Sequence, residues 1–141
     1  MREILFKAKR KDNGDWIEGF LTICDERYFI VENGKVGCLC FDTLPKGHYV
    51  FMPYIEVDQS TVSQFTGLTD KNGKKIFEGD IIEWFLPEVS EYPSVAYIEY
   101  DEESFAWRVC WKKYDPDWLE GMQSQYITVI GNIFDNKDLL S

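Results

Sequence analysis

Hydrophobic and polar residues alternate along many short stretches of this chain, and turn-forming residues separate the stretches. Ile4, Phe6 and Ala8 alternate with a mostly polar set, which is the period of a β-strand with one buried face. A turn cluster follows, and the next apolar stretch, 16–23, is expected to pair back on the first as a hairpin. Further runs rich in β-branched and aromatic residues predict strands at 81–85, 95–100, 105–111 and 126–130.

This pattern predicts an all-β fold with many short antiparallel strands, because the strands recur about every ten residues with turns between them. We expect two small β subdomains, 1–63 and 64–141, within one unit. The second would hold a central hairpin and a C-terminal SH3-like barrel. Helix should be limited to single turns, near 58–61 and 135–140.

The centre of the chain carries two sharp turn signals close together. Asn72-Gly73 can supply the two residues with positive φ that a tight hairpin turn needs. Glu78-Gly79-Asp80 predicts a second reversal, in which Gly79 has positive φ, directly before a strand. We interpret these five residues as a structural turn motif.

The same region resembles a known family. TVSQFTGLTDKNG at residues 61–73, followed by FEGDI at 77–81, is similar to the signature of the YopX family. VIGNIFDN at 129–136 is similar to that family's C-terminal motif, while 20–56 and 86–125 match only in general character. YopX-like proteins are small phage and prophage proteins. The resemblance therefore implies a phage accessory protein, and it brings no established activity and no functional residue.

Composition excludes several classes of function. With 45% hydrophobic and 16% aromatic residues, the chain should fold rather than stay disordered. The net charge is −10, and residues 61–141 hold fifteen acids and seven bases, a net of −8. Such a protein repels phosphate backbones, so we expect no direct nucleic-acid binding. The apolar runs are too short for a membrane span or signal peptide, so we expect a cytoplasmic protein and no membrane contact.

We find no catalytic signature, and we expect no enzyme, cofactor or metal. Cys38 and Cys40 could supply two thiolates, but zinc sites need a second pair or histidines at suitable spacing. His48 stands alone in a Pro/Gly loop, without the nucleophile and carboxylate of a triad. The carboxylates at 99–103 lack the ligand ladder of a calcium loop, and the lysines near residues 71–75 are expected to be solvated turn residues.

Aromatic residues are the unusual feature of the sequence. Tyr92, Tyr114 and Trp118 lie in predicted loops, where burial inside one subunit is difficult. Aromatic anchors in loops are frequent at protein interfaces, and local packing within the loops is the equal alternative.

Three hypotheses for function follow. The first is a non-enzymatic protein-interaction or self-assembling module, with a homo-oligomer expected and a host or phage protein as a further partner. The alternative is an acidic decoy that occupies a host nucleic-acid-binding protein, motivated by the acids of residues 61–141. An enzyme is the third, and no positive sequence feature supports it.

Overall fold

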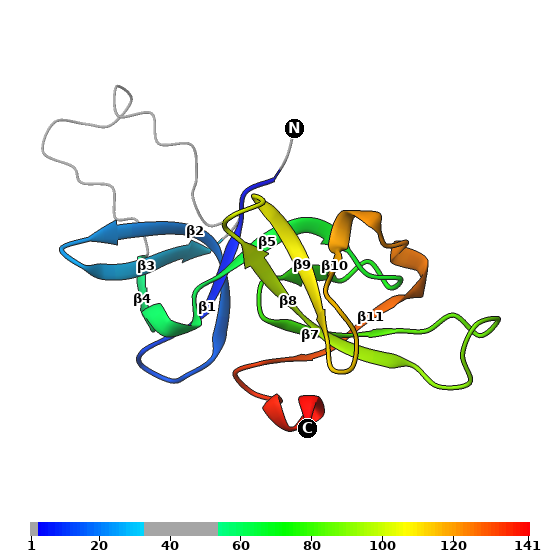
Figure 1. Cartoon of the computed structure of the whole chain (residues 1–141). Helices are drawn as coiled ribbons and strands as arrows, with labels where there is room; N and C mark the ends of the chain where they lie inside the picture. The colour runs from blue at the N-terminus through cyan, green and yellow to red at the C-terminus, as the bar shows by residue number, and fades with distance from the viewer. Residues whose placement is uncertain (1–2, 33–53) are drawn as a thin grey trace, which may run out of the picture. The chain divides into compact units, whose positions relative to one another are not determined.

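The structure is a computed structural model that describes residues 3–32 and 54–141 (Figure 1). Cys38, Cys40 and His48 lie outside the described residues. The chain divides into two compact units, residues 4–62 and residues 63–141, and Glu3 is grouped with the second unit.

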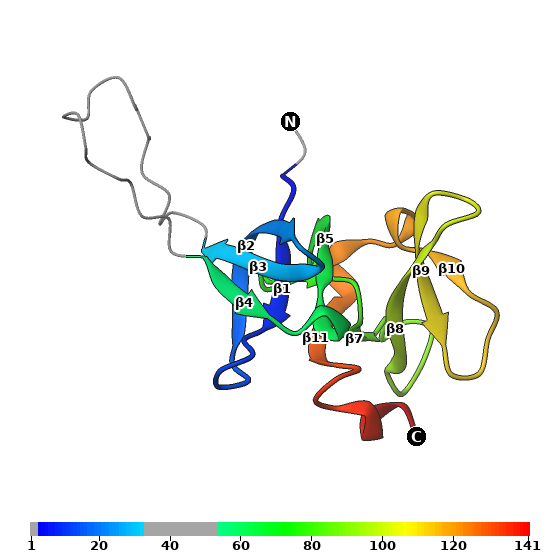
Figure 2. The same cartoon turned by 90° about the vertical axis from the view of Figure 1, so that its left-hand side faces the viewer.

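Four strands make up unit 4–62, and they form one antiparallel sheet in the order β4-β3-β2-β1 (Figure 2). The strands and the single 3₁₀ turn after them are β1 (Phe6–Lys9), β2 (Trp16–Cys24), β3 (Arg27–Glu32), β4 (Ile55–Val57) and η2 (Gln59–Thr61). Alternation in β1 and β2 places Ala8 and Ile17 on the inner face, where they pack with Ile30 and Val57.

Backbone hydrogen bonds also join the two outer strands of this sheet at one end. The backbone N–H of Asp58 donates to Lys9 O at 2.8 Å, and Lys11 N–H donates to Glu56 O at 3.1 Å. The turn η2 then follows, and Asp58 caps it by accepting from the backbone N–H of Ser60 at 3.0 Å. These bonds fix the exit of the chain from the unit.

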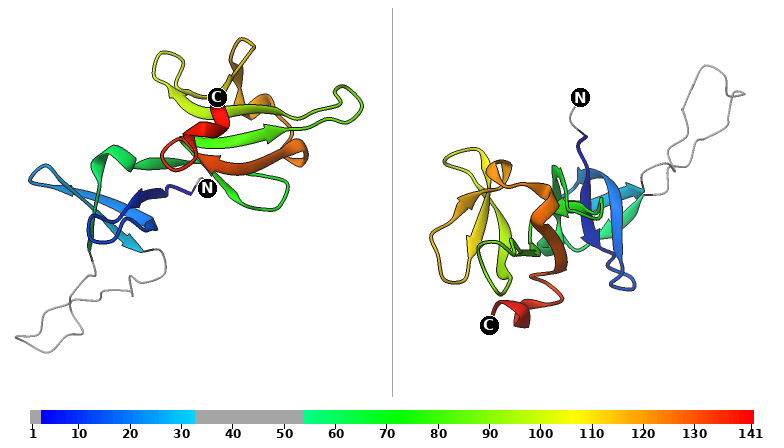
Figure 3. Two further views of the ribbon diagram at one scale, coloured as in Figure 1. Left: turned by 90° about the horizontal axis from the view of Figure 1, so that it is seen from below. Right: turned by 90° about the vertical axis from the view of Figure 1, so that its right-hand side faces the viewer.

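Unit 63–141 is built from a hairpin and a five-stranded antiparallel sheet. The hairpin comprises β5 (Ser63–Thr69) and β6 (Lys75–Phe77). The sheet has the order β10-β9-β8-β7-β11, with β7 (Asp80–Trp84), β8 (Ser94–Asp101), β9 (Ala106–Trp111), β10 (Asp117–Trp118) and β11 (Ile127–Asn132). Three 3₁₀ turns complete it, η3 (Leu119–Gly121), η4 (Ser124–Tyr126) and η5 (Lys137–Leu140), and Figure 3 shows the last of them in red at the chain end.

The two faces of this sheet differ in character. One face carries Ile82, Ala96, Ile98 and Val109, which are buried in one core with Ile127. Residues of the opposite parity, such as Tyr97, Glu99 and Arg108, lie on the other face and are more polar. The alternation seen in the sequence therefore positions one apolar and one partly polar surface.

The all-β prediction is confirmed, since the described residues contain strands and only short 3₁₀ turns. The SH3-like barrel is not confirmed, because no closed barrel is found in the part of the chain that the structure describes. The sequence predicted a loop around Trp118, but Asp117 and Trp118 form the short strand β10. No helix among the described residues is long and apolar enough to cross a bilayer.

Candidate interaction surface

The turn at Asn72-Gly73 joins β5 to β6, as the sequence predicted, but only one of the two residues expected to have positive φ has it. Gly73 has φ +79°, whereas Asn72 does not adopt positive φ. The backbone N–H of Gly73 donates to Asp70 O at 3.0 Å, and Asp70 N–H donates to Lys74 O at 2.8 Å. Only one left-handed residue is needed because the loop is a three-residue turn ending in glycine, not a two-residue turn.

Asp70 organises this hairpin, and the sequence analysis missed its role. Its side chain is 4% exposed and accepts three backbone N–H groups, from Asn72 at 2.9 Å, Lys74 at 2.9 Å and Val129 at 3.0 Å. Burial by itself would raise the pKa of Asp70, but the backbone donors outweigh it and the pKa is lowered. The carboxylate ties the hairpin to β11.

Glu78-Gly79-Asp80 forms the second reversal, and Gly79 has the expected positive φ, +80°. Its N–H donates to Ile98 O and its carbonyl accepts from Ile133 N–H, both at 2.8 Å. Asp80 is 1% exposed and accepts from the backbone N–H of Phe77 at 2.8 Å. This part of the predicted motif is a structural junction in which backbone groups meet.

Glu78 differs from its two neighbours because its side chain borders a cavity of about 290 Å³, together with Glu99 and Glu102. Burial raises the pKa of Glu78, and the charges of Glu99 and Glu102 raise it further. Within residues 3–32 and 54–141, however, no cluster of three or more His, Cys, Asp or Glu side chains could hold a metal ion.

The chemistry beside this cavity is that of an ion pair and a thiol. Arg108 donates to Glu99 Oε2 at 2.5 Å, and the Cys110 thiol lies 3.5 Å from the same oxygen. Burial raises the pKa of Cys110, and so does its hydrogen bond to Glu99. The thiol therefore stays protonated at neutral pH, which is the opposite of an activated nucleophile.

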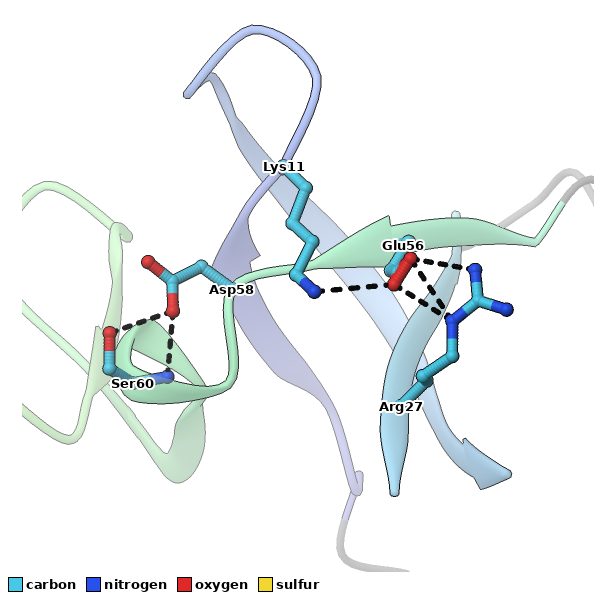
Figure 4. Close-up of polar contacts among 5 residues, drawn as sticks. All are labelled: Lys11, Arg27, Glu56, Asp58 and Ser60. Carbon is cyan, nitrogen blue, oxygen red and sulfur yellow. Dashed lines mark hydrogen bonds and ion pairs between the residues drawn. The ribbon is translucent and has the colours of Figure 1, made fainter. Parts of the chain in front are cut away.

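Unit 4–62 contains a surface cluster of ion pairs that connects parts of its sheet (Figure 4). Arg27 donates to both carboxylate oxygens of Glu56, with its closest contact at 2.7 Å, and Lys11 lies 3.4 Å from Glu56. The hydrogen bonds from Arg27 lower the pKa of Glu56 to about 2. The cluster links the turn after β1 with β3 and β4.

Two of the three predicted interface residues share one cavity. Tyr92 and Tyr114 are 71% and 69% exposed. They line a cavity of about 550 Å³ with Pro93, Trp111 and Leu139 among its other lining residues. The loops that carry the two tyrosines are therefore neighbours in space.

Trp118, the third predicted residue, is 45% exposed and lines a different cavity of about 400 Å³. We call this second cavity the tryptophan cage, and its lining residues are Trp84, Trp111, Asp117, Trp118, Gly121 and Met122. Trp118 belongs to β10, which pairs with β9 through Trp118 and Arg108.

Trp111 lines both cavities and so connects the three predicted residues. The continuous set that results is called here the Trp111 surface, and it consists of Trp84, Tyr92, Trp111, Tyr114, Trp118, Met122 and Leu139. Sequence reasoning missed Trp84 and Trp111, which were assigned to strands. Their position could have indicated this role. Both residues end a strand, where the chain that continues beyond the sheet leaves part of an inward-facing side chain uncovered.

The described residues define a small, turn-rich all-β protein, and comparison with known proteins identifies its family. The chain belongs to the YopX family, because the family model described as YopX protein matches residues 5–141. Among solved structures it is similar to protein EF1440 from Enterococcus faecalis, with 26% identity, a TM-score of 0.56 and full coverage of both chains. No match was found among curated proteins.

Proposed function

We propose that this chain is a non-enzymatic accessory protein of a phage or prophage, and that it acts by protein–protein contact through the Trp111 surface. One observation carries the proposal. Exposed aromatic side chains from two loops, Tyr92 and Tyr114, and from β10, Trp118, line two cavities that share one residue, Trp111. Exposed apolar patches of this kind mark interaction sites.

The character of the side chains fits this role. Trp and Tyr provide large contact areas and are enriched at the energetic centres of interfaces. Pro93, Val95 and Leu139 line the same cavity as the tyrosines and add apolar area to the contact surface. Membership of the YopX family supports the phage or prophage setting, and we expect a protein of that setting to act in the host cytoplasm.

The acidic-decoy alternative has weaker support. A decoy needs free carboxylates spaced over one face like phosphates. In residues 63–141, Asp70 and Asp80 are buried on backbone N–H groups and Glu99 pairs with Arg108. The acids that remain exposed lie in several separate segments, for example Glu88 and Glu91 after β7, Glu102 and Glu103 at the β8–β9 turn, and Asp135 and Asp138 near the chain end.

Site-specific photocrosslinking in the native host cell tests the proposal. A photoreactive phenylalanine analogue replaces Tyr92 or Tyr114 in turn, and crosslinked species are identified by mass spectrometry. We expect a defined protein partner, or a second copy of this chain, at both positions. The control places the analogue at Phe20, which is 47% exposed on β2 in the other unit. Equal crosslinking at Phe20, or none at either tyrosine, contradicts the proposal.

A further inference from the structure

We propose that the tryptophan cage binds a cationic side chain, arginine or lysine, presented by a basic segment of a partner protein. The inference rests on the proposed contact function and names the chemistry that one half of the Trp111 surface recognises. Its starting point is the composition of the cage, which combines three indole rings and a thioether with a single carboxylate, Asp117, and no basic residue.

The cage is held in shape by strand pairing and by ring contacts. Trp84 is paired with Ile127 on β11 and packs edge-on against Tyr126, with ring centroids 5.4 Å apart. On the other side, Asp117 and Trp118 are held by β9. The fully buried Leu119 then anchors η3 in the core, and Met122 N–H donates to its carbonyl at 3.0 Å. A preformed site of this kind loses little entropy on binding.

The hydrogen bond between Trp111 and Asp117 decides what the cage offers to a ligand. The indole N–H of Trp111 donates to Asp117 Oδ2 at 2.8 Å, so this donor is already used. Trp111 therefore has no free donor to offer a ligand, and the π face of an indole ring carries negative charge that attracts cations. An ionised carboxylate accepts more than one hydrogen bond, so Asp117 can also pair with an incoming cation.

Charge selects a cation over the other ligands that fit aromatic walls. A proline-rich segment would cover the rings but would remove water from Asp117 without replacing it. An anionic ligand would be repelled by Asp117 and by the net charge of −8 on residues 63–141, which contain fifteen acids and seven bases. Lys112 and Lys113 line the neighbouring cavity and not the cage, so the cage itself keeps its negative character.

The size of the cage fits one long side chain and not a whole folded element. Its volume of about 400 Å³ lies near the lower end of small-ligand pockets. A guanidinium group is the better occupant of the two cations, because its planar face stacks on indole while its edge pairs with a carboxylate.

The test is a titration of the full chain with an acetylated and amidated peptide of alternating glycine and arginine. The matched probe replaces every arginine by citrulline, which has the same shape without the charge. Binding is followed by indole N–H signals in ¹⁵N NMR and by tryptophan fluorescence. We expect the arginine peptide to move the signals of Trp84, Trp111 and Trp118, and the citrulline peptide to bind at least about fivefold more weakly.

Two variants and a matched control complete the experiment. Asp117→Asn keeps an oxygen that can accept from Trp111 and removes the charge, and Trp118→Ala removes an exposed wall. Both should weaken the arginine peptide about five- to tenfold. Asp115→Asn removes an equal charge from an exposed residue outside the cage and should change binding by less than about twofold. Thermal melting confirms that each variant is folded.

Equal affinity for the citrulline or a polyproline peptide overturns the inference, and so does an equal loss in Asp115→Asn. Absence of any shift at the three indoles overturns it as well. Failure of the cage inference can be distinguished from failure of the proposed function. If Tyr92 and Tyr114 crosslink a partner but the arginine peptide does not bind the native chain, the contact function stands and the cage inference fails. If the peptide binds the cage but neither tyrosine crosslinks, the proposed function fails.

Discussion

At the scale of single residues, Asp70 is the polar group on which the central hairpin depends. It is nearly fully buried and accepts backbone N–H groups from its own turn and from Val129. Asp70→Ala would leave these donors without an acceptor, and we expect it to lower the free energy of unfolding by about 2–4 kcal/mol. Chemical denaturation measures the loss, and Asp138→Ala at an exposed site is the control.

The lowered pKa of Asp70 gives the same residue a pH signature. Its folded pKa lies below the ordinary value of 3.8, so the folded state binds the proton less readily than the unfolded chain. The stabilisation is complete above pH 3.8 and is lost as the pH falls through the lowered pKa. The stability gap between the native chain and Asp70→Asn should therefore narrow in acid, and a constant gap would contradict this reasoning.

Glu78 should show the opposite pH dependence. Its folded pKa is raised above 4.5 by burial and by Glu99 and Glu102, so the folded state holds the proton more tightly. Ionisation then destabilises the fold as the pH rises above 4.5. We expect Glu78→Gln to melt with the native chain at pH 4 and above it at pH 7. A variant that melts lower at pH 7 would show that the carboxylate has a stabilising contact.

Gly79 tests the second reversal directly. Its φ of +80° is unfavourable for a residue with a Cβ, and an added Cβ would lie 3.3 Å from a ring carbon of Phe134. Gly79→Val should cost about 1–3 kcal/mol in unfolding free energy. The matched control is Gly121→Ala, where no positive φ occurs and no atom lies within 4 Å of the new Cβ. An equal loss of stability in the two variants would show that the positive φ of Gly79 is not the cause.

At the scale of elements, substitutions in the β2–β3 turn should increase the stability of the fold. Asp25 and Glu26 have φ of +50° and +62° between the paired residues Cys24 and Arg27, as in a two-residue turn with both central residues left-handed. Asn-Gly suits this geometry best. The double variant Asp25→Asn, Glu26→Gly should raise the unfolding free energy by about 1 kcal/mol. Glu103→Gly, at a residue without positive φ, should bring no gain.

The same turns show how far local sequence predicts this fold. Asn72-Gly73 and Gly79 predicted chain reversals because glycine tolerates positive φ, and both reversals are present in the structure. Asp25-Glu26 gave a weaker signal, since aspartate tolerates positive φ but the second position holds glutamate and not glycine. The strand β10 contains two residues, too few for any alternation to be recognised.

The candidate site was less predictable because it is assembled by long-range pairing. Trp118 was recognised as a loop aromatic, but its partners Trp84 and Trp111 come from β7 and β9 and meet it only through the sheet. In the same way, Asp70 reaches Val129 across 59 residues of sequence. A local pattern identifies the residue types that suit an interface, while the strand order decides which of them meet.

At the scale of the whole molecule, self-association is the remaining prediction, and two forces oppose each other. The charge of −10 per chain disfavours contact between copies. Salt screens this repulsion beyond about 10 Å at 0.1 M, whereas buried apolar area contributes roughly 25 cal/mol per Å². The Trp111 surface also places Lys112 and Lys113 in one cavity beside Asp117 in the next, so two copies could pair opposite charges around a symmetry axis.

We therefore expect a closed homo-oligomer that forms more readily as salt is raised, because screening removes the repulsion and leaves the aromatic contact. Light scattering at micromolar concentration and moderate salt should give a multiple of 16.6 kDa. The double variant Tyr92→Ser, Tyr114→Ser should shift the protein toward the monomer, since both side chains are well exposed and contribute contact area. The control Phe20→Ser changes an exposed aromatic residue of the other unit and should leave the mass unchanged. A native chain that scatters as 16.6 kDa at every salt concentration would refute the prediction.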